Sequence, residues 1–243
     1  GMSTQFVWGS MEILIYRAFW LEHPERFPMG MDALSAYIWM QQAFLAFFAM
    51  WYFEQDLVDA VQNGSAAYEL TRPTDLYGMW IARTLALRLS RAALRCLPIL
   101  VVAVLIPAPF GLRLRIAPST FALFLLSMAL MLLVVCAYTL FVYALGFHMV
   151  STQGIRWLSL SAADLLGGAI VPLPFLPEPL RTIAALSPFG AMQNVPLRIF
   201  GGDIAGAEIA SAMGLQLLWA AILAAAGYGL MHSGLRRAVI AGG

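Results

Sequence analysis

The sequence predicts an all-α transmembrane fold with about six membrane-spanning helices. Hydrophobic residues make up 61% of the 243 residues and charged residues only 11%, whereas about a quarter of a soluble domain is charged. Apolar runs recur at roughly the 20-residue length that crosses a bilayer. Eight Arg residues lie at one side of the resulting map and five at the other, which is a modest bias. We therefore expect a single transmembrane domain over residues 1–243.

Six charge-poor runs are the candidate spans. They cover residues 6–21, 34–53, 87–106, 119–146, 157–175 and 208–231. The second, fourth and sixth are the most apolar, while the first is short and polar, the third has a cationic start and the fifth ends in prolines. Five or seven spans are the alternatives to six.

The Arg residues orient this map. The richer side holds Arg72, Arg83, Arg88, Arg91, Arg95, Arg156, Arg236 and Arg237. An Arg excess marks the cytoplasmic side, and with an even number of spans both termini lie there. We expect a multi-pass protein of the bacterial inner membrane. Indoles favour the headgroup region, and four Trp residues lie near predicted span ends: Trp20, Trp51, Trp80 and Trp157.

Residues 54–83 predict a structured cytoplasmic element between the second and third spans. They combine acidic residues with a turn at Asn63-Gly64-Ser65 and end near Arg72-Pro73. Beyond this element, Arg88, Arg91 and Arg95 recur at i, i+3 and i+7, which places them on one helix face. We expect this stripe to reach phosphates at the inner headgroup boundary.

Residues 171–202 are rich in proline yet too apolar for an exposed loop. The prolines are Pro172, Pro174, Pro177, Pro179, Pro188 and Pro196. Because proline removes amide donors and ends helices, the segment predicts short helices that dip into the outer leaflet, covered by protein. We expect a re-entrant or interfacial extracellular element before the last span.

The sequence lacks the residues that several kinds of chemistry require. The 14 basic residues are all Arg, so the Lys of a Walker A phosphate loop is missing. The three His residues make no zinc-binding pair, and no Ser stands in a G-x-S-x-G elbow. No basic and aromatic patch lies outside the membrane. We expect no catalytic residue, no metal site and no nucleic-acid partner.

Two stretches resemble the ABC-2 type permease family of six-helix exporter subunits, and within it the efflux branch. Gly-Ser-Ala-Ala-Tyr-Glu-Leu-Thr-Arg-Pro at 64–73 is similar to the cytoplasmic family pattern of a glycine, then acid-Leu-x-Arg-Pro. Leu-Gly-Gly-Ala-Ile-Val-Pro-Leu-Pro-Phe-Leu-Pro at 166–177, then Leu-Ser-Pro-Phe at 186–189 and Pro196 to Gly201, is similar to the extracellular pattern. The likeness runs from about residue 6 to the end. The amphipathic helix that usually opens family members is not seen before Phe6, so either the native chain extends upstream or this member lacks that helix.

The resemblance implies the permease subunit of an ATP-driven exporter that moves a hydrophobic or amphipathic substrate, cationic ones included, out of the cytoplasm by alternating access. It implies a separate ABC ATPase subunit that binds ATP and Mg²⁺, a second permease protomer, identical or homologous, and contact with membrane lipid; no cofactor is expected on this chain. The implied ATPase-coupling residues are Gly64, Tyr68, Glu69, Leu70, Arg72 and Pro73. The implied extracellular gate comprises Pro172, Pro174, Phe175, Pro188 and Phe189. An ATP-independent secondary transporter or channel is the main alternative, and an intramembrane enzyme or an assembly factor is a third.

Charged residues inside a span are costly and are candidates for function. Asp164 is either a cavity carboxylate that favours cationic substrates or a residue that solvates the cytoplasmic end of its span. Glu12 and Arg17 are too far round one helix to pair with each other, so each bridges to another helix or reaches the interface. Glu69 and Arg72 have the alternative of an i, i+3 pair on a loop helix. Four uncharged residues are candidates for cavity lining or interhelical hydrogen bonds: Gln41, Gln42, Ser127 and Gln216.

Overall fold

Helices form the regular structure throughout the part of the chain that the computed structural model describes, and this part contains no strand. The described residues are 1–62, 65–66, 75–113, 116–149 and 151–241. The helices are α1 (Met2–Glu22), α2 (Met31–Ala43), α3 (Leu45–Phe48), α4 (Gln55–Gln62), α6 (Leu76–Leu105), α7 (Pro118–Gly146), α8 (Thr152–Leu166), α9 (Leu180–Leu186), α10 (Val195–Gly201) and α11 (Ala207–Ala241). Short 3₁₀ turns cover Pro24–Arg26 and Leu173–Phe175, and a π-helical turn covers Gly190–Asn194. The predicted all-α class is confirmed.

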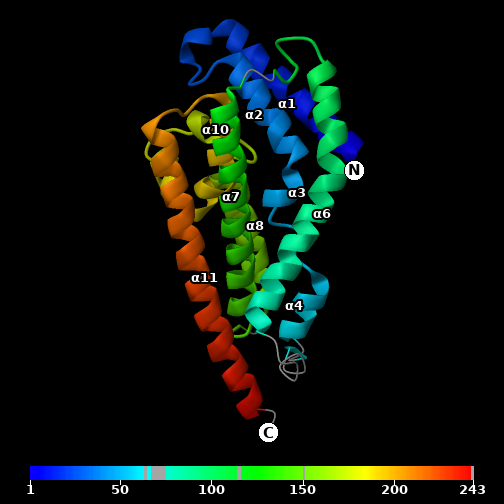
Figure 1. Ribbon diagram of the computed structural model, residues 1–243, viewed down its shortest axis with the longest axis vertical. Coiled ribbons are helices and arrows are strands. Elements are labelled where there is room, and N and C mark those ends of the chain that lie inside the picture. Colours follow the sequence, from blue (N-terminus) through cyan, green and yellow to red (C-terminus); the bar gives the residue numbers. More distant parts are fainter. Residues whose placement is uncertain (63–64, 67–74, 114–115, 150, 242–243) are drawn as a thin grey trace.

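The long helices run roughly along one axis, with α7 beside α11 (Figure 1). These two helices run in the same direction, because residues further along α7 contact residues further along α11. Ser127 meets Gln216, and a Cβ added at Gly227 would lie 3.3 Å from the Phe141 backbone. Glycine on α11 lets the two backbones approach closely, as is common between membrane helices.

The core of the molecule lies where α2, α7 and α10 pack on one another. Residues Gly190–Asn194 and most of α10 are buried there, so part of the proline-rich segment is interior. Ser127 donates a hydrogen bond to Gln216 Oε1 at 3.0 Å, and Gln216 Nε2 donates to the Ala191 carbonyl at 2.9 Å. Both polar side chains are fully buried, so each satisfies a group that lipid or apolar packing would leave unpaired.

Two helices are long and apolar enough to cross a membrane by length and composition: α7, and Ala207–Arg236 of α11. A described helix overlaps each of the six predicted runs, but six crossings remain a prediction. The run at 34–53 is not one helix, because α2 and α3 end by Phe48 and residues 52–54 are irregular. The run at 157–175 was also placed wrongly. Its helix, α8, begins at Thr152 and ends at Leu166, before Gly168 takes a φ of 83°.

The third predicted span begins earlier than expected and changes the environment of the Arg stripe. The Asp75 side chain accepts from the Gly78 amide at 2.8 Å and caps α6, so the helix includes the end of the 54–83 element. Arg88 is only 2% exposed. Its Nη1 donates to the carbonyls of Phe47, at 2.8 Å, and Ala49, at 3.1 Å. The expectation that Arg88 contacts headgroup phosphates is therefore wrong, because its guanidinium binds the carbonyls at the point where the helix ends after α3.

The other two Arg residues of the stripe face the same irregular segment. The Arg91 guanidinium lies 4.8 Å from the centroid of the Tyr52 ring. Arg95 donates to the Tyr52 hydroxyl at 2.9 Å. The helix face was predicted correctly, but it packs against the segment that links α3 to α4.

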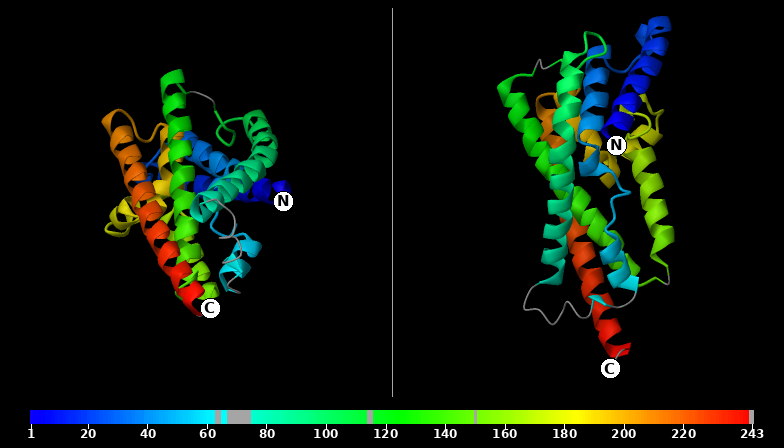
Figure 2. Two further views of the ribbon diagram at one scale, coloured as in Figure 1. Left: turned by 60° about the horizontal axis from the view of Figure 1, so that its bottom comes forward. Right: turned by 90° about the vertical axis from the view of Figure 1, so that its right-hand side faces the viewer.

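The described part of the 54–83 element and the C-terminal end of α11 lie at the same end of the molecule (Figure 1). The proline-rich elements lie toward the opposite end, and α1 begins part-way along the bundle (Figure 2). This arrangement agrees with the predicted placement of 54–83 and 171–202 on opposite sides. Short helices do form in 171–202, but its re-entrant insertion remains a prediction.

Candidate functional site: a cavity between α1, α2 and α8

A cavity of about 460 Å³ lies between α1, α2 and α8. All four predicted cavity residues line it, and they come from three helices, of which α8 is far from α1 and α2 in sequence. Its lining residues are Trp8, Met11, Glu12, Ile15, Tyr16, Gln41, Gln42, Leu45, Trp51, Asp164, Ala169 and Ile170. The cavity is thus largely apolar with a few polar groups, which is usual for sites that bind small molecules.

One face of α8 supplies Asp164. Gln153, Arg156, Trp157 and Leu160 recur at i, i+3, i+4 and i+7, and Asp164 follows one turn later on the same face. The first four line a separate cavity, described below. Asp164 lies in the last turn of α8, far from the start of that helix at Thr152, and its side chain is half-buried.

Close contact between α1 and α2 places Glu12 at the cavity. A Cβ added at Gly9 would lie 3.0 Å from Gln42 Cγ and 3.3 Å from the Trp39 ring. Only glycine fits this approach without movement of a neighbour. Glu12 lies one turn further along α1, and its Oε1 is buried and has no hydrogen-bond partner among the described residues. The two helices thus hold a carboxylate oxygen at the cavity with unused acceptor capacity.

Residues that follow α8, Gly168 and Ala169, close one side of the cavity. Gln41 Nε2 donates to the Ala169 carbonyl at 2.7 Å, and its Oε1 is left without a partner among the described residues. Gly168 makes this approach possible, because it has positive φ and its missing Cβ would lie 2.9 Å from both the Tyr37 hydroxyl and Leu173 Cδ1. A left-handed backbone at this crowded position requires glycine.

The ionisable residues that line the cavity on its described part are acidic, apart from the tyrosine Tyr16. Glu12 and Asp164 line it, and no Arg or His does so among the described residues. Arg17, on the same helix as Glu12, instead places its guanidinium 4.4 Å from the centroid of the Phe110 ring. Glu12 and Arg17 therefore do not pair with each other, as expected. A site with two carboxylates and no cation favours positively charged ligands.

The predicted gate residues divide into two groups. Phe175 packs against Tyr16, which lines the cavity, with ring centroids 5.0 Å apart. Phe189 instead packs against Tyr138 of α7 at 5.2 Å. Pro174 and Phe175 lie in the 3₁₀ helix Leu173–Phe175 and Pro172 directly precedes it, whereas Pro188 and Phe189 begin the helical segment that continues into Gly190–Asn194.

The predicted ATPase-coupling residues Gly64, Tyr68, Glu69, Leu70, Arg72 and Pro73 lie outside the described residues. The neighbouring helix α4 is described, and ion pairs join it to α6. Arg83 reaches Glu54 at 2.5 Å and Asp56 at 3.0 Å. Burial raises the pKa of Glu54, and the nearby Arg83 charge opposes that rise.

Sequence reasoning did not single out Tyr16 or Trp51 as cavity residues, nor Arg88 as a residue that holds the broken helix. The aromatic residues carry no charge that would mark them inside an apolar run. The helical spacing of the Arg stripe predicted the helix face on which Arg88 lies, but it did not predict that Arg88 is buried. The sequence did contain a signal for Trp51, because an indole at the end of a predicted span has an N–H group that needs a polar environment.

None of the curated proteins and none of the solved structures compared with the chain matches it. A family model described as ABC-2 family transporter protein matches residues 29–242. The match includes α2, α6, α7, α8 and α11, and it contains both stretches on which the sequence resemblance rests. The chain therefore belongs to the ABC-2 transporter family and is a membrane permease.

Proposed function

We propose that the chain is the permease subunit of an ATP-driven exporter, and that the cavity between α1, α2 and α8 binds a hydrophobic or amphipathic substrate with a positive charge. Family membership supports the transport role. The single observation that favours a cationic substrate is the presence of Glu12 and Asp164 in one cavity without a basic residue among its described lining.

The rest of the lining fits the remainder of such a ligand. Trp8, Tyr16 and Trp51 provide aromatic rings, which attract cations through their faces. Gln41 offers an amide oxygen without a partner among the described residues. An amphipathic cation would place its charge near the carboxylates and its apolar part against these rings.

ATP hydrolysis is assigned to a separate subunit. We propose that residues 64–73 dock on this ATPase and that the ion pairs of Arg83 with Glu54 and Asp56 carry its movement from α4 into α6. Arg88 would extend this connection, because it binds the carbonyls at the end of α3. Movement of α6 would then displace α2 and α3, which adjoin the cavity.

A second permease protomer, identical or homologous, completes the proposed exporter. The outer side chains of α1 near the cavity are apolar and exposed, among them Val7, Trp8 and Met11. Trp8 and Met11 also line the cavity, so its rim is part of this surface. A protomer on this face would close the cavity from the side, and Phe175 would help to close it from the extracellular end.

The substrate assignment is tested with two probes of similar shape and opposite charge, tetraphenylphosphonium and tetraphenylborate. Equilibrium binding to the purified permease is compared for wild type, Glu12→Gln, Asp164→Asn and the double variant. Loss of each carboxylate is expected to weaken binding of the cation about tenfold, or ~1.4 kcal/mol. Glu208→Gln, at the exposed start of α11, is the matched control. Equal binding of both probes, or an unaffected double variant, contradicts the proposal.

The ATPase assignment is tested by co-purification with the product of the neighbouring ATPase gene and by ATPase activity in lipid nanodiscs. Glu69→Ala combined with Arg72→Ala is expected to reduce both association and activity. An Arg26→Ala variant, altered on the predicted opposite side, should retain them. If no ATPase associates with the wild-type chain, an ATP-independent transporter or channel becomes the better account.

A further inference from the structure

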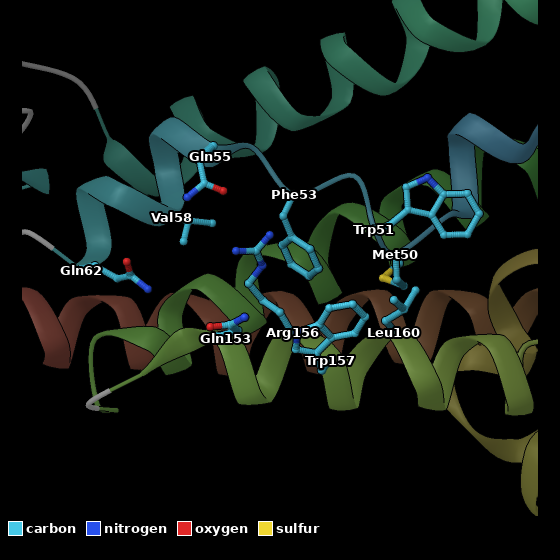
Figure 3. A pocket seen from close by; sticks show the side chains of 10 residues that line it. All are labelled: Met50, Trp51, Phe53, Gln55, Val58, Gln62, Gln153, Arg156, Trp157 and Leu160. Atoms are coloured by element: carbon cyan, nitrogen blue, oxygen red, sulfur yellow. The ribbon is translucent and has the colours of Figure 1, made fainter. Parts of the chain in front are cut away.

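A second cavity, of about 480 Å³, lies between α4, α8 and the irregular segment after α3. It shares Trp51 with the proposed substrate cavity, and the proposed function uses none of its other described lining residues. Figure 3 shows its ten lining side chains. One end carries three amides and the other carries large apolar groups. The amides are Gln55, Gln62 and Gln153, and the apolar groups are Met50, Trp51 and Leu160. The cavity is therefore polar at one end and apolar at the other.

Arg156 lies between these two ends and has no countercharge among the residues that the structure describes. Its guanidinium points toward the Phe53 ring, 5.1 Å from the centroid. No Asp or Glu lines the cavity, and no described carboxylate forms an ion pair with Arg156. Arg83, close by on α6, shows the contrast, because Glu54 and Asp56 both neutralise it. A half-buried cation of this kind attracts an anionic group.

Exposed indoles that line the cavity indicate that it lies at the level of the bilayer headgroups. Trp157 is 61% exposed and Trp51 is 46% exposed, and both line the cavity. Exposed indoles favour the membrane interface. Gln62 Nε2 donates to Thr152 Oγ1 at 2.6 Å, which ties α4 to the start of α8. The amide end therefore lies toward the side predicted to face the cytoplasm.

We propose that this cavity binds an anionic phospholipid of the inner leaflet. The phosphate lies at Arg156, the polar headgroup faces Gln55 and Gln153, and an acyl chain follows Leu160 and Trp51 toward the apolar end. A soluble anion would leave the apolar end uncovered, and an ammonium headgroup would find no carboxylate among the described lining. The single helix face of α8 thus offers a cation to lipid at Arg156 and a carboxylate to substrate at Asp164.

The test measures phospholipid retention by native mass spectrometry of the intact permease, and then affinity in nanodiscs of phosphatidylcholine with or without phosphatidylglycerol. Wild type is expected to retain phosphatidylglycerol in preference to phosphatidylcholine. Arg156→Gln is expected to weaken this preference about fivefold, as for the loss of one basic residue at an anionic surface. Arg156→Lys should keep most of it, because the charge remains.

Arg17→Gln is the matched control, since Arg17 also lies over an aromatic ring but lines neither cavity. It should leave phosphatidylglycerol retention unchanged. Thermal unfolding of each variant in detergent establishes that it is folded. Equal retention by wild type and Arg156→Gln overturns the proposal. Glycerol phosphate that binds as tightly as the lipid overturns it too, because the acyl chain would then contribute nothing. Tetraphenylphosphonium binding should be unaffected by Arg156→Gln, so failure of this proposal is distinguishable from failure of the substrate assignment.

Discussion

Gln216 in the core and the charged residues beside the two cavities belong to two regions of this permease, and they differ in how their polar groups are satisfied. In the core, where α7, α11 and the Gly190–Asn194 turn meet, Gln216 is fully buried and both its amide and its carbonyl have hydrogen-bond partners. Beside the two cavities, Glu12 has a buried oxygen without a hydrogen-bond partner and Arg156 has no paired carboxylate, in both cases among the described residues. Unsatisfied groups cost stability. Because Glu12 and Arg156 each line a cavity, their unsatisfied groups are available to ligands. The predictions below compare the two regions through stability, from the largest expected effect to the smallest.

Arg88→Leu should cause the largest loss. The substitution removes the donors that satisfy the Phe47 and Ala49 carbonyls, and leaving such groups buried costs about 3 kcal/mol in the free energy of unfolding. Unfolding by sodium dodecyl sulfate in mixed micelles measures the change. Arg91→Leu is the control, because its guanidinium lies over the Tyr52 ring and makes no hydrogen bond or ion pair among the described residues, and it should cost about 1 kcal/mol or less. Similar losses would mean that the hydrogen bonds of Arg88 do not hold the break after α3.

Gly168→Ala is expected to rank second. Its positive φ and the 2.9 Å approach of the Tyr37 hydroxyl to an added Cβ predict a loss of about 2 kcal/mol. The same unfolding assay applies. Gly214→Ala on α11 meets no atom within 4 Å, so it should be neutral or slightly stabilising. A neutral Gly168→Ala would show that the turn after α8 adjusts freely.

Gln216→Met and Gln42→Met compare one glutamine from each region. Loss of the bonds from Gln216 to Ser127 and Ala191 should cost about 1 kcal/mol, since interhelical hydrogen bonds in membranes are individually weak. Gln42 lines the open cavity and should change stability by about 0.5 kcal/mol or less. If both variants lose the same amount, the cavity glutamine is as firmly held as the core glutamine and the distinction between the regions fails.

Glu12→Gln and Asp164→Asn should have the smallest effect on stability, within about 0.5 kcal/mol, because no described group pairs with either carboxylate. They should instead remove the stabilisation that tetraphenylphosphonium gives to wild type, which follows from preferential binding to the folded state. Thermal unfolding with and without this cation measures both quantities. A marked loss in the absence of ligand would assign these carboxylates to the fold.

The sequence by itself determined the membrane class, the all-α fold, the approximate positions of the helices and the family resemblance. Hydropathy and residue order are local quantities, so the charge-free run that became α7 was predicted within one residue. The same reasoning identified Glu12, Gln41, Gln42 and Asp164 as candidates, because a polar residue in an apolar run is visible without knowledge of its neighbours.

Only the tertiary structure decided which of these residues meet and which charges are neutralised. Arg88 and Arg156 look alike in sequence, yet one binds the carbonyls of a broken helix and the other lines a cavity. The helix ends at Phe48 and Leu166 likewise depend on packing, since carbonyl groups released there need donors from elsewhere in the fold. Hydrogen bonds and ion pairs form between segments distant in the chain, and no local pattern specifies the partner.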